Sequence, residues 1–175
     1  MTTPSPSSTP SSPSPTPSAS SDSTAGPLTV TVDELPQLQG TTMGPSEWRT
    51  ITQEDIDVFA DLTGDHNPIH VDEEVAAASV YGTRIAHGLL SLSIVVPHLS
   101  QLWKVTGVGM GINYGLNRVR FPAPTPAGGR VRASAEVLEV TELDGGWQVV
   151  LKVTYEVEGG TKPVCVAEFV LRYYR

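Results

Sequence analysis

The chain has 175 residues, with 11 Lys and Arg against 19 Asp and Glu and a formal net charge of −8. Such an acidic chain lacks the positive field that attracts nucleic acid, so we expect no nucleic-acid partner. A single cysteine excludes an intrachain disulfide framework and a multi-thiolate zinc site, and it fits a reducing compartment. The longest apolar stretch, near residues 93–97, is far shorter than the roughly 20 residues that span a bilayer. We therefore expect a cytoplasmic protein without membrane contact.

The first 26 residues differ in composition from the rest. Of these, 23 are Ser, Thr, Pro or Ala, and six of the 15 prolines fall there. Such a segment has little apolar surface to offset the entropy lost on ordering, so we expect a disordered tail, either dispensable or used as a tether or modification platform. It has no basic and apolar regions of a secretory signal. Residues 27–175 then form one domain.

Helical patterns occupy the first half of this domain. Thr52 precedes Asp55 by three residues, which resembles a capping box, and an apolar helical period follows up to Gly64. A second short helix begins at the acids of residues 72–74 and ends near Gly82. A third begins at Gly88 and runs to Trp103; because it is apolar on nearly every face, we expect it to be buried, with a kink caused by Pro97.

From Gly107 onward the apolar residues alternate, which predicts β-strands. Four strands are expected, around residues 112–121, 131–137, 147–157 and 165–173, with turns at residues 122–129, 144–146 and 159–160. A buried helix followed by antiparallel strands is typical of an α+β fold, in which the sheet wraps around a central helix.

Residues 64–70 carry the strongest chemical signal. Asp65 and His70 flank a loop that contains Asn67 and Pro68. An imidazole exchanges protons near neutral pH, and a carboxylate can orient a water or share its proton, so the pair suits carbonyl or enoyl chemistry. The structural alternative is that Asp65 caps a turn and His70 is an ordinary polar residue at a helix start.

Gly88 is the second candidate. The free N–H groups where the buried helix begins could stabilise an oxyanion, and a glycine lets a substrate approach the backbone closely. The alternative is that Gly88 merely begins the helix.

Other candidate sites are weaker. His66 and His70 have the spacing of a metal pair, but Pro68 between them disfavours helical geometry, so no metal site is expected. The glycines at 107, 109 and 111 do not complete a dinucleotide fingerprint. Cys165 lies on the apolar face of a strand and is predicted to be a core residue.

The run FADLTGDHNPIH at residues 59–70, followed by Ala76, resembles the signature of the (R)-specific enoyl-CoA hydratases of the MaoC-like group. Three further segments resemble its nodulation-protein-N-like branch: IAHG at 85–88, GINYGLNRVRFPAP at 111–124 and KPVCVAE at 162–168. Asn67 and Pro68 follow the hydratase pattern, whereas that branch usually has bulkier residues there. The resemblance covers most of residues 30–175.

The resemblance implies a hot-dog fold that catalyses reversible hydration of trans-2-enoyl thioesters to (R)-3-hydroxyacyl thioesters in fatty acid metabolism, with no cofactor. The substrate would be an acyl-CoA or an acyl-carrier thioester. Asp65 and His70 would be catalytic, and the Gly88 N–H would form the oxyanion hole. Substrate-binding positions would be Asn67, which also supports the pair, and Ile85, Ala86, His87, Asn113 and Tyr114.

A homodimer is expected, because Val164, Val166 and Val170 add an apolar side to a strand whose other side is already apolar. A heterodimer with another hot-dog chain is the alternative. Two rival functions remain at this point. One is a hot-dog acyl-CoA thioesterase, in which His70 has no obvious role; the other is a non-catalytic acyl-thioester-binding subunit, which would be expected to have lost Asp65 or His70.

Overall fold

The main sheet is formed by the four segments with alternating apolar residues. The computed structural model describes residues 26–175, so the predicted tail at residues 1–26 lies outside the described residues except for its last position. The long strands are β5 (Met110–Arg120), β6 (Arg130–Leu143), β7 (Gly146–Val157) and β8 (Cys165–Tyr174). All four predicted strands are therefore confirmed.

The long strands are antiparallel and follow the order β6-β7-β8-β5. Two short strands, β2 (Thr42–Met43) and β3 (Arg49–Thr50), pair with β6, so β5 forms the opposite edge of the sheet. A separate parallel pair joins β1 (Leu28–Thr31) to β4 (Trp103–Thr106), and the 3-10 helix η1 (Val32–Leu38) follows β1. The alternation did not predict these short pieces.

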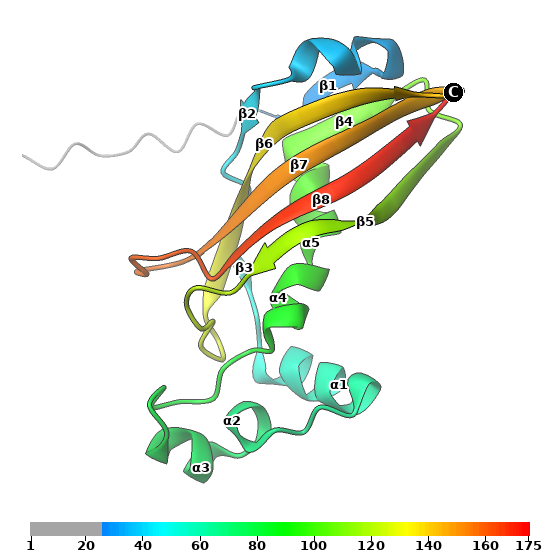
Figure 1. Cartoon of the computed structure of the whole chain (residues 1–175). Helices are drawn as coiled ribbons and strands as arrows, with labels where there is room; N and C mark the ends of the chain where they lie inside the picture. The colour runs from blue at the N-terminus through cyan, green and yellow to red at the C-terminus, as the bar shows by residue number, and fades with distance from the viewer. Residues whose placement is uncertain (1–25) are drawn as a thin grey trace, which may run out of the picture.

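The central helix lies against the sheet (Figure 1) and consists of α4 (Gly88–Ser93) and α5 (Val95–Leu102), separated at Ile94. The interruption at Ile94 lies one turn before Pro97, the residue from which a kink was predicted. A proline ring clashes with the backbone carbonyl four residues before it, which explains why the helix is disturbed on that side of Pro97. Trp103 was expected to end this helix, but its extended backbone (φ −149, ψ 156) begins β4 instead.

The core lies between this helix and the inner face of the sheet. Alternate residues of β6, β7 and β8 point inward, and the following are fully inaccessible to solvent: Val131, Ala133, Val137, Val149, Leu151, Val153, Tyr155, Cys165 and Ala167. Burial raises the pKa of the Cys165 thiol to about 12, so it stays protonated and inert, as predicted for a core residue. These strands fix the position of the central helix and hence of its first residue, Gly88.

Three short helices lie beyond one end of the sheet (Figure 1): α1 (Gln53–Thr63), α2 (Pro68–Val71) and α3 (Glu73–Ala78). The predicted capping box begins α1, with Thr52 and Asp55 each accepting a backbone N–H of the other. Gly64 ends α1 in the left-handed conformation at φ +77, which favours glycine. The predicted helix after Asp72 is α3, which ends before Gly82.

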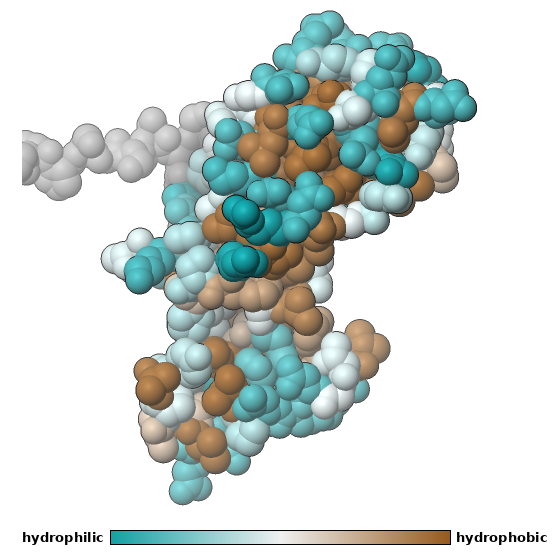
Figure 2. Space-filling model, in the orientation of Figure 1, coloured by the Kyte–Doolittle hydropathy of each residue, from teal (hydrophilic) through white to brown (hydrophobic). Residues whose placement is uncertain are grey.

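Hydrophobic residues reach the surface both over the sheet and on the α1–α3 segment (Figure 2). Within residues 26–175, no helix combines the length and the apolar character needed to cross a bilayer.

Candidate active site

The loop between α1 and α2 is held by local hydrogen bonds. Asn67 is the N-cap of α2, and its side chain accepts the Ile69 N–H at 3.3 Å. Pro68 occupies the first turn of that helix, where its missing N–H costs nothing. Asn67 thus holds the start of the helix from which His70 projects, and its roles in supporting the pair and binding substrate stay predictions.

His70 is 8% exposed, and its ring is fixed by the backbone of a distant segment. The ring Nδ1 lies 2.7 Å from the carbonyl oxygen of Ile85. A carbonyl only accepts, so Nδ1 carries the proton and Nε2 keeps a lone pair. Ile85 also donates its backbone N–H to the Ile69 carbonyl at 3.1 Å, so residues 69 and 70 of α2 are both bound to Ile85. His70 is therefore oriented to exchange a proton through Nε2.

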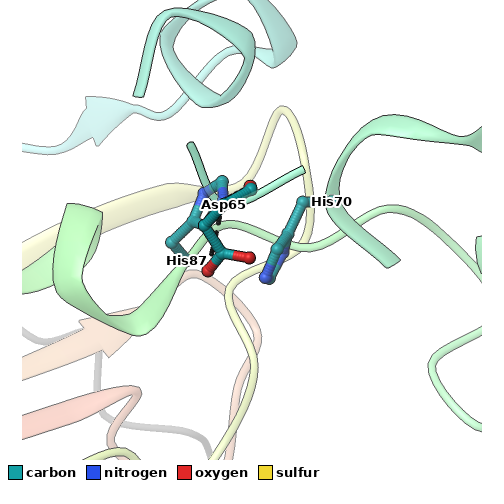
Figure 3. Close-up of side chains that lie close together, drawn as sticks. All are labelled: Asp65, His70 and His87. Carbon is teal, nitrogen blue, oxygen red and sulfur yellow. Dashed lines mark hydrogen bonds and ion pairs between the residues drawn. The ribbon is translucent and has the colours of Figure 1, made fainter. Parts of the chain in front are cut away.

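Asp65 offers a solvent-accessible carboxylate beside this ring, with its side chain 57% exposed. Polar side-chain atoms of Asp65, His70 and His87 all lie within 4.8 Å of one another (Figure 3). One water spans about 5 to 6 Å between two hydrogen-bonding atoms, so a single water can contact both the carboxylate and the His70 ring. The structure thus brings Asp65 and His70 together, as predicted.

His87 lies beneath this pair and is 3% exposed. Its Nε2 lies 2.9 Å from the carbonyl oxygen of Asp65, and its ring centroid is 3.8 Å from that of His70. Phe59 of α1 packs near its ring, at 5.0 Å between centroids. The sequence suggested His87 as a substrate contact, but its ring is enclosed by protein.

Gly88 begins α4 directly after His87 and lines a pocket of about 250 Å³. Ile85 and Ala86 line the same pocket, together with Ser91 and residues 121–125. Asp65 and His70 do not line this pocket. They are joined to it by hydrogen bonds, from His70 to the Ile85 carbonyl and from His87, the neighbour of Gly88, to the Asp65 carbonyl. The Phe121 ring lies so close to Gly88 that a Cβ there would come within 2.8 Å of it. Packing therefore also requires glycine at position 88.

Asn113 and Tyr114 lie elsewhere in the single chain. Both belong to the edge strand β5, and the Tyr114 ring lies against the guanidinium of Arg172, 3.2 Å from the ring centroid. Tyr114 precedes Phe121 by seven residues, which is roughly 23 Å along a strand. Their contribution to substrate binding therefore stays a prediction.

The described residues contain one cluster that could hold a metal ion, and it is Asp65, His70 and His87. The two imidazole rings lie 3.8 Å apart between centroids with an interplanar angle of 32°, and one nitrogen of each ring is already bound to a backbone carbonyl. His66, considered in the sequence as a partner of His70, instead contacts Asp61 at 2.8 Å, and this hydrogen bond raises the pKa of His66. The geometry suits proton transfer better than metal binding.

Comparisons with known proteins agree with this geometry. The family model described as MaoC like domain matches residues 34–159. The chain is 50% identical over 144 residues to 3-hydroxyacyl-thioester dehydratase Z of Mycobacterium tuberculosis, covering 82% of this chain and 95% of that protein. It is 40% identical over 145 residues to nodulation protein N of Rhizobium leguminosarum bv. viciae, covering 81% and 89%.

Among solved structures, an (R)-hydratase from A. caviae involved in PHA biosynthesis is similar, with a TM-score of 0.63 and 26% identity over 76% of this chain and 94% of that one. The expected hot-dog architecture is thereby confirmed. The fold, the loop that joins Asp65 to His70 and the match over residues 34–159 lead to one conclusion: the chain belongs to the MaoC-like domain family.

Proposed function

We propose that this chain is a hydro-lyase that interconverts trans-2-enoyl thioesters and (R)-3-hydroxyacyl thioesters. One observation carries the proposal: the Asp65 carboxylate and the His70 imidazole lie close enough to hold one water between them. The dehydratase and (R)-hydratase relatives support both the reaction and its stereochemistry. Coenzyme A or an acyl-carrier phosphopantetheine is the group that carries the acyl chain.

The reaction begins with a water held by Asp65 and His70. Its oxygen forms a bond to C3 of the enoyl group while the pair removes one proton. The C2–C3 π electrons move toward the thioester carbonyl, and the enolate oxygen becomes negative. A proton then returns to C2 as the carbonyl re-forms. The His70 ring suits this transfer, because its Nδ1 bond to the Ile85 carbonyl leaves Nε2 free to take up a proton.

The negative charge that builds on the thioester oxygen needs a donor close by. The backbone N–H of Gly88 is our candidate, since Gly88 both lines the pocket and follows His87 of the cluster. Removing one oxyanion donor costs on the order of 3 kcal/mol in other enzymes, so this contact matters nearly as much as the acid and base. Ile85 and Ala86 line the same pocket and are proposed to contact the substrate.

A thioesterase is the alternative enzyme, and His70 distinguishes it from a hydratase. Hydrolysis of the thioester requires one carboxylate to activate water against the carbonyl carbon. The oriented and nearly buried His70 would then have no chemical role. A non-catalytic binding subunit would need neither side chain, yet both are present and adjacent.

We also propose a homodimer formed through β5. This strand is an 11-residue edge, and Met110, Ile112, Tyr114 and Leu116 on it are exposed. Native proteins rarely leave such an edge open, and pairing of two identical edges covers both. Of the three valines that suggested a partner in the sequence, Val164 and Val170 are already buried within one chain and do not require a partner, whereas Val166 is half-buried.

The test of the function is an assay on a short trans-2-enoyl-CoA near neutral pH. We expect loss of the enoyl thioester absorbance without release of free thiol, and a product that chiral chromatography identifies as the (R) isomer. Thiol release without hydration would support the thioesterase instead. Neither signal would support the non-catalytic subunit.

A further inference from the structure

His87 touches both members of the proposed catalytic pair and directly precedes the proposed oxyanion donor (Figure 3). Its Nε2–H donates to the Asp65 carbonyl at 2.9 Å, and its ring stacks on His70 at 3.8 Å. The next residue is Gly88. The buried His87 side chain therefore lies where three parts of the site meet: Asp65 of the α1–α2 loop, His70 of α2, and Gly88 at the start of α4.

The hydrogen bond from His87 is important because Asp65 is weakly held otherwise. Its carboxylate accepts the Asn67 N–H at 3.4 Å, and its own N–H lies 3.4 Å from the Thr63 hydroxyl. The 2.9 Å bond from His87 is the shortest that Asp65 makes within the described part of the chain. The same Nε2 lies 3.9 Å from the carboxylate oxygen Oδ2, so His87 meets Asp65 at its backbone carbonyl and, at longer range, at its 57% exposed carboxylate.

The contact with His70 restrains the second member of the pair. One ring nitrogen of His70 is fixed by the Ile85 carbonyl, and this bond alone allows the ring to rock about it. Stacking against His87, which is itself backed by Phe59, limits that motion. The pair therefore depends on His87 for the distance between carboxylate and imidazole.

We propose that His87 is a positioning residue, which sets the geometry of Asp65 and His70 without contacting substrate. The inference rests on the proposed function, and it deepens it by adding a residue on which the pair depends. Because the ring is 3% exposed, substrate does not reach it. Its loss should lower kcat and leave substrate binding nearly unchanged, because a displacement of about 1 Å can cost a hundredfold in rate.

Two substitutions separate the hydrogen bond from the packing. His87→Phe keeps a ring against His70 but removes the donor to Asp65, and we expect kcat to fall tenfold to a hundredfold with KM changed less than threefold. His87→Gln restores an N–H near the Nε2 position, and we expect it to recover at least a third of the lost activity on a logarithmic scale. His66→Gln changes an exposed imidazole in the same loop and should leave kcat within twofold.

An NMR measurement tests the contact without using activity. Long-range 15N–1H spectra of the wild-type imidazoles should assign the Nε2–H tautomer to His87 and the Nδ1–H tautomer to His70. The opposite tautomer at His87 would overturn the proposal even if the enzyme is an active hydratase. Absence of hydration by the wild type would refute the proposed function and leave the tautomer result standing.

The kinetic outcomes are equally distinct. A folded His87→Phe variant with kcat within twofold of wild type would overturn the proposal, as would a raised KM with unchanged kcat, which would mean a substrate contact. If His87→Phe does not fold, the NMR tautomer and the His87→Gln variant still decide.

Discussion

A single methyl group added at Gly88 tests how the start of α4 is positioned. The Cβ of Gly88→Ala would lie 2.8 Å from Cγ of Phe121 and within 3.0 Å of two more ring carbons. Ordinary contacts begin near 3.4 Å, so the ring or the backbone must move by roughly 0.6 Å. The backbone N–H itself is retained, so a loss of activity reports a displacement of that N–H or of the Phe121 ring, which also lines the pocket.

We expect kcat of Gly88→Ala to fall tenfold to a hundredfold, or about 1.4 to 2.7 kcal/mol of transition-state stabilisation. The double variant Gly88→Ala with Phe121→Ala removes the clashing ring and should recover most of this loss. Phe121→Ala alone is the control, and because Phe121 lines the pocket we expect mainly a higher KM.

The assay is hydration of a short enoyl-CoA, with a thermal melt of each variant to confirm folding. If Gly88→Ala retains full activity, the reasoning that places the oxyanion donor at this crowded position is refuted. If the double variant is no better than Gly88→Ala, the contact with Phe121 is not the cause of the loss.

Three further predictions concern the tail, the core and the sheet edge. Deleting residues 1–26 should change kcat and Tm very little, because we propose that the domain begins after them; a tenfold drop in kcat would oppose this. Burial, and secondarily the charge of Arg49, lowers the pKa of His98 in the folded state. The unfolded chain therefore binds a proton at His98 more readily than the folded one, and the free energy of unfolding should fall as the pH decreases through about 6.5, the ordinary pKa of histidine. In denaturant melts between pH 5 and 7.5, the free energy of unfolding of His98→Asn should depend less steeply on pH than that of the wild type. An equal dependence would mean that His98 is not the cause. Ile112→Lys places a charge on β5 and should yield monomers by light scattering; an unchanged dimer would place the interface elsewhere.

Much of the fold follows from local patterns in the sequence. The Thr52–Asp55 capping box marks the start of α1, and alternation marks the four long strands, because each of these features depends on neighbouring residues. The parallel pair of β1 and β4 was not predicted, since each strand has four residues and the partners are far apart in the chain. The helical period also continued through Trp103, where the backbone becomes extended.

The candidate site was predictable in part for the same reason. Asp65 and His70 belong to one contiguous motif, so both could be named from the sequence. The substrate contact expected of His87 comes from the family resemblance and stays a prediction. Its burial and its stacking on His70 could not be predicted, because they exist only once α2 and the start of α4 pack together. Asn113 and Tyr114 belong to the segment at 111–124 that resembles the nodulation-protein-N-like branch, and in the structure both lie on β5 at the edge of the sheet.

We propose that Asp65 and His70 act as one unit on a bound water. The most direct measurement is the hydration rate of Asp65→Asn, His70→Gln and the double variant, each checked for folding by a denaturant melt. We expect each single change to lower kcat by a factor of roughly a hundred to ten thousand, with little effect on the binding of a saturated acyl-CoA. The double variant should be little worse than either single one, because the unit fails as a whole. Near-normal hydration by both single variants would contradict the account, and a loss of cooperative unfolding would mean that the pair only stabilises the loop.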